Sequence, residues 1–181
     1  AFETILLSHG GLKTKCLLLL QNICATFNPN DLKNVEKLIM LLLFNQIIGR
    51  NDEYDEENNS IIETILIDNF LKPERLLSLS IEFHQMLKLL LQYSNIVMAK
   101  FPNLISSIIY SVSIVFVEQK PIKIDQYEFL LRFVTYLAII TDNNMIMFQC
   151  LNIISLPTTA PDKRFILDNA FDTFIYNYKK K

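Results

Sequence analysis

The densest group of residues that could do chemistry is the acidic segment 51–59 (NDEYDEENN). Clustered carboxylates are ligands that Ca²⁺ prefers, but an EF-hand loop also needs a glycine at its sixth position and a bidentate glutamate at its twelfth. No frame through this segment supplies both residues. The pattern therefore favours a solvated loop between helices that could meet a basic protein partner. The candidate partner-binding side chains are Asp52, Glu53, Asp55, Glu56 and Glu57.

The other reactive residues form no recognisable catalytic or metal motif. His9 and His84 do not stand in an HExxH zinc pattern. Cys16, Cys24 and Cys150 lack CxxC spacing and lie in apolar runs, which is typical of buried thiols in a reducing compartment. The chain has only three glycines and no glycine-rich phosphate loop. We therefore expect no enzyme activity, no metal and no cofactor.

Composition narrows the class of protein further. Hydrophobic residues make up 51% of the 181 residues and charged residues only 20%, so the chain should bury much of itself or part of itself against something else. This apolarity and the start at Ala1 fit a segment of a longer protein, whose flanking repeats would be partners of this one. The net charge of −2 gives no field that attracts nucleic acid.

No targeting segment or membrane span is expected. The N-terminus lacks a basic region followed by an apolar core and a small-residue cleavage site. The uncharged stretch 101–117 is shorter than the ~20 residues that a membrane helix needs. We expect an intracellular protein, cytoplasmic or nuclear.

The prolines indicate how helices position these residues. Pro29, Pro73, Pro121 and Pro161 lie 44, 48 and 40 residues apart. Because proline is tolerated in the first turn of a helix and disfavoured inside it, each marks a boundary between helical runs. A period of roughly 40–47 residues is typical of helix-pair solenoid units. The fold class predicted is all-α, built from stacked antiparallel helix hairpins in a single helical domain or solenoid segment.

Apolar residues at steps of three and four predict about eight or nine helices. Capping boxes place helix starts after Ser60, with Glu63, and after Asp125, with Glu128. The long run from Pro73 to about residue 100 is expected to break at Tyr93-Ser94-Asn95. The helix pairs span about 12–48, 60–100, 102–141 and 143–178, with the acidic loop 51–59 between the first two.

Aromatic residues concentrate in the last third of the chain. Phe129, Phe133 and Tyr136 follow one helix face and are predicted to pack in the core. On the final helix a second core-facing stripe is expected from Phe171, Phe174 and Tyr178, and Tyr176 lies off that stripe.

The stretch 73–138 resembles HEAT/ARM-type repeats, and in particular C-terminal repeats of importin-β-superfamily nuclear transport receptors. The shared features are an opening Pro73-Glu74, a long helix ending in Phe101-Pro102, a serine-rich apolar second helix and the aromatic-rich segment FLLRF at 129–133. The charged residues often seen at fixed HEAT positions are mostly absent. The resemblance implies binding of cargo, a Ran-like GTPase or Phe-Gly repeats in grooves between helices, and it transfers no site residue.

Two functions from different classes follow. The first is a non-catalytic protein–protein interaction segment of a larger helical scaffold, such as a nuclear transport receptor. The alternative is a compact Bcl-2-like helical bundle that binds an amphipathic partner helix in a groove, with the helix at 104–116 buried at its centre. Helices that pack in the order of the sequence favour the first, and a helix buried on all sides favours the second.

Overall fold

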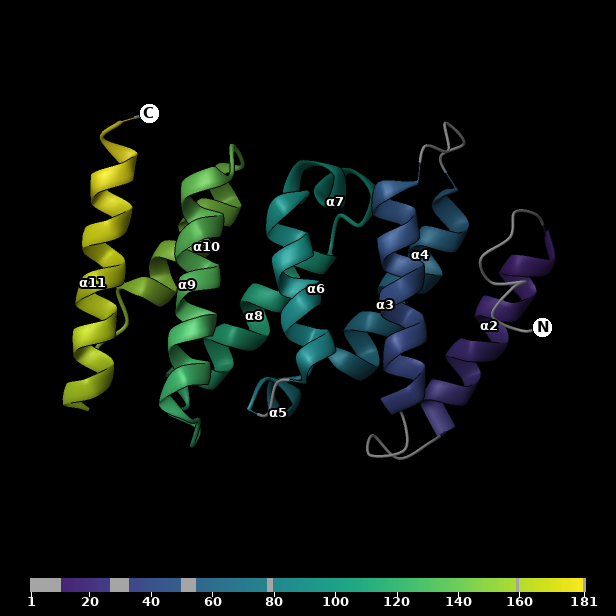
Figure 1. Cartoon of the computed structure of the whole chain (residues 1–181), viewed down its shortest axis with the longest axis horizontal. Coiled ribbons are helices and arrows are strands. Elements are labelled where there is room, and N and C mark those ends of the chain that lie inside the picture. Colours follow the sequence, from purple (N-terminus) through teal and green to yellow (C-terminus); the bar gives the residue numbers. More distant parts are fainter. Residues whose placement is uncertain (1–10, 27–32, 50–54, 78–79, 159, 181) are drawn as a thin grey trace. The chain divides into compact units, whose positions relative to one another are not determined.

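The computed structural model describes residues 11–26, 33–49, 55–77, 80–158 and 160–180. Within these ranges the regular structure is helical and contains no strand (Figure 1), which confirms the all-α prediction. The chain divides into two compact units. Unit 1 comprises Ala1–Lys72 with Asn95–Ile105, and unit 2 comprises Pro73–Ser94 with Ser106–Lys181.

Unit 1 is built around helix α4. Its elements are α2 (Gly11–Thr26), α3 (Lys33–Ile48), α4 (Glu56–Ile65), the π-helical turn η2 (Leu66–Phe70) and all but the first residue of α7 (Ser94–Lys100). Helix α4 packs against both α2 and α3. The core of unit 1 includes Leu17, Ile39, Phe70 and Phe101, which are at most 1% exposed.

Unit 2 is built around helix α9. Its elements are α5 (Pro73–Leu76), α6 (Ile81–Gln92), α8 (Leu104–Val117) from Ser106 onward, α9 (Ile124–Ile140), α10 (Asn144–Ile154) and α11 (Pro161–Tyr178). Helix α9 packs against α6, α10 and α11, so α6, α9 and α11 lie side by side in Figure 1. Leu130 and Val134 of α9 are fully buried in this packing.

Several predicted boundaries are confirmed. Pro73 and Pro161 open α5 and α11. The break expected near residue 93 occurs at Tyr93, the C-cap between the end of α6 at Gln92 and the start of α7 at Ser94. The run from residue 73 also breaks earlier, before Ser80, whose hydroxyl accepts a hydrogen bond from the Phe83 N–H at 3.1 Å and caps α6.

The capping box predicted at Ser60 is wrong. Helix α4 begins at Glu56, and its cap is Asp55, whose carboxylate accepts a hydrogen bond from the Asn58 N–H at 3.2 Å. The earlier cap is favoured because the Asp55 carboxylate accepts hydrogen bonds from both the backbone N–H and the side-chain amide of Asn58. The predicted loop 51–59 is therefore helical from residue 56 onward, while residues 51–54 lie outside the described part.

The capping box predicted at Asp125 is also wrong. Helix α9 is already helical at Ile124, and its cap, Lys123, makes no side-chain capping bond. Asp125 therefore lies in the first turn, where it accepts a hydrogen bond from the Gln126 N–H at 3.0 Å. Glu128 forms an ion pair with Arg132 instead of closing a capping box.

Within the described residues, no helix is by itself both long and apolar enough to cross a membrane. Helices α7 and α8 meet a test of length and composition only as a pair, and they are bent by 106° at the break between them.

A buried carboxylate of α4 holds the turn after α7. Glu63 is only 7% exposed and accepts hydrogen bonds from the backbone N–H of Asn103 at 2.6 Å and from its side-chain amide at 3.2 Å. The Lys100 ammonium, at the end of α7, donates to the carbonyl oxygen of Gln46 in α3 at 2.6 Å. These charge-assisted bonds tie the turn at 101–103 to both α3 and α4 within unit 1.

We expect Glu63→Ala to lower the free energy of unfolding by about 1–3 kcal/mol, because it removes two charge-assisted hydrogen bonds to Asn103. Glu63→Gln should lose less, since its amide oxygen can still accept from the backbone N–H of Asn103. Urea unfolding followed by circular dichroism measures both changes. Asp168→Ala, at an exposed helical position, is the control and should change stability by less than about 0.5 kcal/mol. Equal stability of Glu63→Ala and Asp168→Ala would contradict the assignment.

Helix α8 ends in a Schellman motif that lacks the usual glycine. The N–H of Gln119 donates to the Phe116 carbonyl at 3.2 Å, and the N–H of Lys120 donates to the Val115 carbonyl at 3.1 Å. This pattern requires a left-handed residue at the helix end. Gln119 takes that conformation with φ 48°, which is unfavourable for a residue that carries a Cβ.

Gln119→Gly should therefore raise the free energy of unfolding by about 0.5–1 kcal/mol, because glycine adopts this backbone conformation without a steric penalty. Gln119→Ala keeps the Cβ and serves as the matched control, with no gain expected. Thermal and urea unfolding of the three proteins provide the measurement. A gain with alanine equal to that with glycine would show that the side chain, and not the backbone, is responsible.

Candidate functional site

The acidic residues predicted to bind a partner are divided by the structure. Asp52 and Glu53 lie outside the described residues. Asp55 caps α4, while Glu56 and Glu57 are exposed in the first turn of that helix. Their negative charge is favourable there because it lies near the positive end of the helix dipole. Two exposed carboxylates of the predicted set thus remain on the described surface, and a third has a structural role.

Asp55 also influences a buried lysine of α2. Lys13 is only 5% exposed, and burial lowers the pKa of its ammonium below the usual value, while the negative charge of Asp55 acts in the opposite direction. This interaction lies within unit 1, where α2 and α4 pack together. The charge of Asp55 therefore helps to stabilise the helix pair.

The histidine that the structure describes has a packing role. His84 Nδ1 lies 3.0 Å from the carbonyl oxygen of Ser80, and its ring centroid lies 4.2 Å from that of Phe129. It therefore joins α6 to α9 inside unit 2, whereas His9 lies outside the described residues. In the described ranges, no three His, Cys, Asp or Glu side chains lie close enough together to hold a metal ion.

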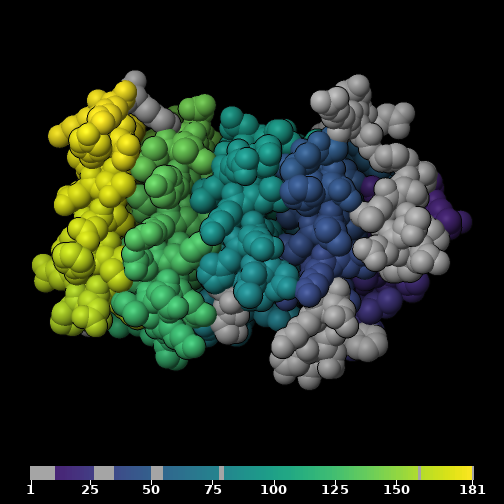
Figure 2. All heavy atoms as spheres, viewed as in Figure 1, coloured from purple at the N-terminus to yellow at the C-terminus, as the bar shows by residue number. Residues whose placement is uncertain are grey.

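A groove of about 710 Å³ lies between α9 and α11 in unit 2. We call it the α9–α11 groove. In Figure 2 the side chains of α9 are green and lie beside those of α11 in yellow. Its lining side chains recur at steps of three and four on both helices: Glu128, Leu131, Arg132, Thr135 and Tyr136 on α9, and Pro161, Asp162, Phe165, Ile166, Asn169, Ala170 and Thr173 on α11.

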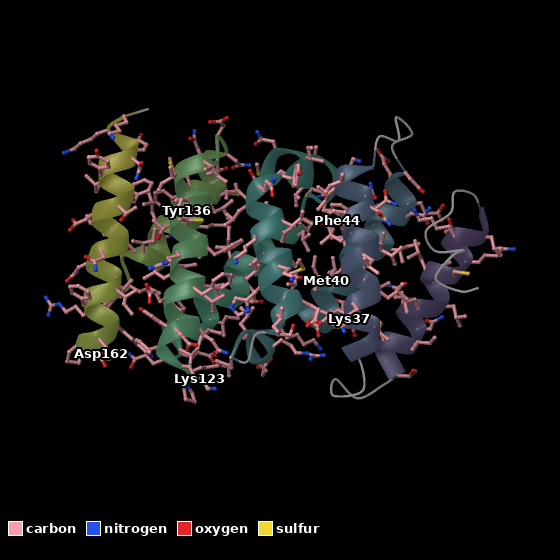
Figure 3. The ribbon with its side chains drawn as sticks, viewed as in Figure 1. Lys37, Met40, Phe44, Lys123, Tyr136 and Asp162 are labelled. Atoms are coloured by element: carbon pink, nitrogen blue, oxygen red, sulfur yellow. The ribbon has the colours of Figure 1, made fainter. Side chains whose placement is uncertain are left out.

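Two exposed aromatic side chains line this groove. Tyr136 is 56% exposed on α9, and Phe165 is 69% exposed on α11. Figure 3 labels Tyr136 toward the end of α9 and Asp162 at the start of α11. Exposed aromatic side chains also occur elsewhere on the described surface, for example Phe148 at 66%, but Tyr136 and Phe165 line one groove together.

The charged residues of the groove lie at one end of it. Glu128 and Arg132 form an exposed ion pair one helical turn apart on α9, which contributes little to stability. Asp162 lies in the first turn of α11. The other half of the groove is lined by apolar and small polar side chains, including Ala170 and Thr173. The groove therefore has a polar end and an apolar, aromatic body.

The sequence predicted the burial of these aromatic side chains correctly only in part. Phe133 is 2% exposed and lies in the core as predicted, but Tyr136 is not a core residue. On α11, Phe174 is buried, whereas Phe171 and Tyr178 are 44% and 53% exposed, so the predicted core stripe is wrong at two of its three positions. The groove requires α9 and α11 to be neighbours, and the helical period of each helix alone does not provide that information.

Comparison of this chain with protein-family models, with curated proteins and with solved structures finds no match. The resemblance to HEAT repeats therefore stays a prediction.

The two buried thiols favour no redox or nucleophilic role. Cys24 and Cys150 are buried, and burial raises the pKa of both thiols, that of Cys150 from 9.0 to about 12. A reactive cysteine needs the thiolate form, which burial in apolar surroundings disfavours.

Cys150 should make the protein lose stability in alkali. Its folded-state pKa is raised, so its contribution is fully present below pH 9 and is lost as pH rises from 9 to about 12. We expect wild type to lose up to about 1.4 kcal/mol per pH unit more than Cys150→Ala across that window. Urea unfolding at closely spaced pH values measures the difference. Parallel pH profiles for the two proteins would contradict the shift.

Proposed function

We propose that this chain is a non-catalytic protein-binding segment of a larger helical scaffold, and that the α9–α11 groove receives an amphipathic helix of a protein partner. The observation that carries the proposal is the pair of exposed aromatic side chains, Tyr136 and Phe165, on facing walls of a groove of about 710 Å³. Aromatic anchors of this kind dominate the binding energy of protein interfaces.

The dimensions of the groove favour a helix as its occupant. Its α11 wall runs from Pro161 to Thr173, which is about 18 Å at ~1.5 Å per residue. That length matches about three turns of a partner helix. A helix presents apolar residues at steps of three and four, the same spacing at which the walls present theirs. Tyr136, Phe165 and Ile166 would then pack against its apolar face.

The polar end of the groove favours one chemical feature in the partner. Asp162 lies at this end and forms no ion pair with another described residue. Glu128 beside it is already paired with Arg132. A lysine or arginine at one end of the partner helix would complement Asp162, while the body of the helix would be apolar. Such a rim charge contributes more to orientation and association rate than to affinity.

The packing of unit 2 supports membership of a helical scaffold. Helix α9 contacts the next two helices, α10 and α11, and also α6. Contacts between successive hairpins are the basis of solenoid stability. Apolar side chains of α2 in unit 1 are also exposed, and a flanking repeat or another partner would cover them. They are Leu12 at 58%, Leu18 at 44% and Leu19 at 52%.

A role as a nuclear transport receptor is a further hypothesis. Binding of a basic partner by Glu56 and Glu57 is another.

One observation favours the alternative, a compact bundle. Only Tyr110 and Val117 of α8 are exposed, at 66% and 61%. A helix so nearly buried fits the centre of a bundle as well as the inner layer of stacked hairpins. Small-angle scattering separates the two, because a compact chain of 181 residues should have a radius of gyration near 16 Å.

A library of displayed 12–16-residue peptides, patterned as amphipathic helices, tests the groove directly. We expect selected peptides to carry an apolar stripe and to lose at least about tenfold in affinity for Phe165→Ala, because an interface anchor contributes 1.4 kcal/mol or more. Fluorescence anisotropy of the labelled peptides measures the affinity.

The chain offers a matched control for that experiment. Phe148 on α10 is 66% exposed, close to the 69% of Phe165, and does not line the groove. Phe148→Ala should leave peptide affinity unchanged. Peptides that bind both alanine variants equally well, or a library that yields no binder, would overturn the groove as the binding site.

A further inference from the structure

Helix α2 of unit 1 has apolar side chains on two sides. Those that it buries within the unit include Leu17, Leu20 and Cys24. A second set lies on another side of the helix, at steps of four, three and four residues, and we call it the α2 stripe: Leu12, Cys16, Leu19 and Ile23. Leu12 and Leu19 are exposed, while Cys16 and Ile23 are half-buried. The α2 stripe is therefore a row of accessible apolar side chains on a helix that the unit already holds in place.

One exposed positive charge accompanies the α2 stripe. Lys15 lies one helical turn from Leu12 and one turn from Leu19, is exposed, and forms no ion pair with another described residue. The other lysine of α2, Lys13, is buried, and the range 11–26 contains no acidic residue. The accessible side of α2 is thus apolar along its length and positive near its N-terminal end.

We propose that the α9–α11 groove receives helix α2 of a second copy of this chain. The inference rests on the proposed function, because it identifies the amphipathic helix that the groove would bind. The α2 stripe has the helical spacing of the groove walls, and Lys15 supplies the positive charge that suits Asp162. From Leu12 to Ile23 the stripe is about 17 Å long at ~1.5 Å per residue, close to the length of about 18 Å of the α11 wall.

Charge complementarity sets the direction of the docked helix. The charged side chains that line the groove are two carboxylates and one guanidinium, so this end of the groove is negative. Asp162 lies in the first turn of α11. With Lys15 beside Asp162, the docked α2 runs in the same direction as α11. Because the two helices share one rise per residue, Leu19 then lies alongside Ile166, and Ile23 alongside Ala170.

Helix α3 is the other helix of unit 1 with an exposed apolar side. Leu41, Phe44 and Ile48 are exposed at steps of three and four, and Figure 3 labels Phe44 together with Lys37 of the same helix. Lys37, however, already interacts with another residue. Lys15 has no ionic partner among the described residues, so its charge is available to Asp162. The charges therefore favour α2 over α3 as the occupant.

The proposed contact joins two different surfaces, which makes it head-to-tail. Every added copy brings one α2 stripe and one groove, so association continues beyond a dimer into an open chain or a closed ring. A single helix in a groove forms a small interface, and such interfaces are weak and transient. The association should therefore depend strongly on protein concentration.

Sedimentation velocity of the full chain over a range of concentrations tests the proposal. We expect the average mass of wild type to rise with concentration and to pass that of a dimer. Leu19→Glu, on the α2 stripe, and Phe165→Ala, in the groove, should each lower the association constant at least about tenfold. Leu18→Glu is the matched control, since Leu18 is 44% exposed against 52% for Leu19 and lies off the stripe. It should associate like wild type.

A mixture of the two weakened variants tests the head-to-tail geometry. Leu19→Glu retains an intact groove, and Phe165→Ala retains an intact α2 stripe. An equimolar mixture should therefore form a dimer of one copy of each and no larger species. Charge exchange tests the orientation: Lys15→Glu and Asp162→Lys should each weaken association about threefold or more, and the double variant should regain it.

Two results would contradict the proposal: a mass of one chain at all concentrations up to roughly 0.5 mM, which covers weak interfaces, or a mixture that forms no dimer. Leu41→Glu, on α3, should associate like wild type. If it weakens association and Leu19→Glu does not, α3 is the occupant and the proposal is wrong. Selected library peptides should still bind Leu19→Glu, whose groove is open. If they bind while no second copy does, the proposed function stands and only this occupant is wrong.

Discussion

Satisfaction of backbone N–H and C=O groups at helix ends is the constraint on which this structure depends, and the Glu63–Asn103 contact is its clearest case. A chain of short apolar helices has many ends, and each buried end leaves backbone groups that need partners. Glu63 supplies an acceptor for the turn before α8, and the ammonium of Lys100 serves a carbonyl at the end of α3. Apolar contacts provide most of the stability of the fold, but they are not directional and do not determine where a helix ends. The few buried polar contacts decide where each helix stops and how the chain turns.

This constraint explains why most helices were predictable from the sequence, whereas the residues that cap them were predictable only in part. Proline restricts its own backbone whatever surrounds it, so Pro73 and Pro161 marked helix starts correctly. A capping side chain is different, because several candidates compete for the same N–H groups. Asp55 is the cap instead of Ser60, and its carboxylate accepts hydrogen bonds from both the backbone N–H and the side-chain amide of Asn58. The all-α class was thus predictable, whereas which of two plausible caps is used required tertiary structure.

The candidate sites were less predictable because they lie between elements. A helical stripe shows which residues share a face, but it does not show whether another helix covers that face. Tyr136 and Phe133 are three residues apart, yet one is exposed and the other buried, since α11 leaves the groove open beside Tyr136. The acidic segment 51–59 was predicted to bind a partner from its composition alone. In the structure, Asp55 of this segment caps a helix. The charge density of the sequence pointed to the segment 51–59. The candidate binding surface, the α9–α11 groove, was found only from the exposed aromatic residues on two neighbouring helices.

Helix α11 contributes both to the core of unit 2 and to the α9–α11 groove, and its low amphipathicity follows from that. An ordinary surface helix has one apolar face toward the core and one polar face toward water. Helix α11 buries only Leu167 and Phe174. Asp162 and Phe165 line the groove on one side, while Lys163 lines a smaller cavity on another. A helix whose residues line a core, a groove and a cavity cannot show a single apolar stripe. The exposure of Phe171 and Tyr178 on the face that also carries the buried Phe174 is consistent with these three neighbouring environments.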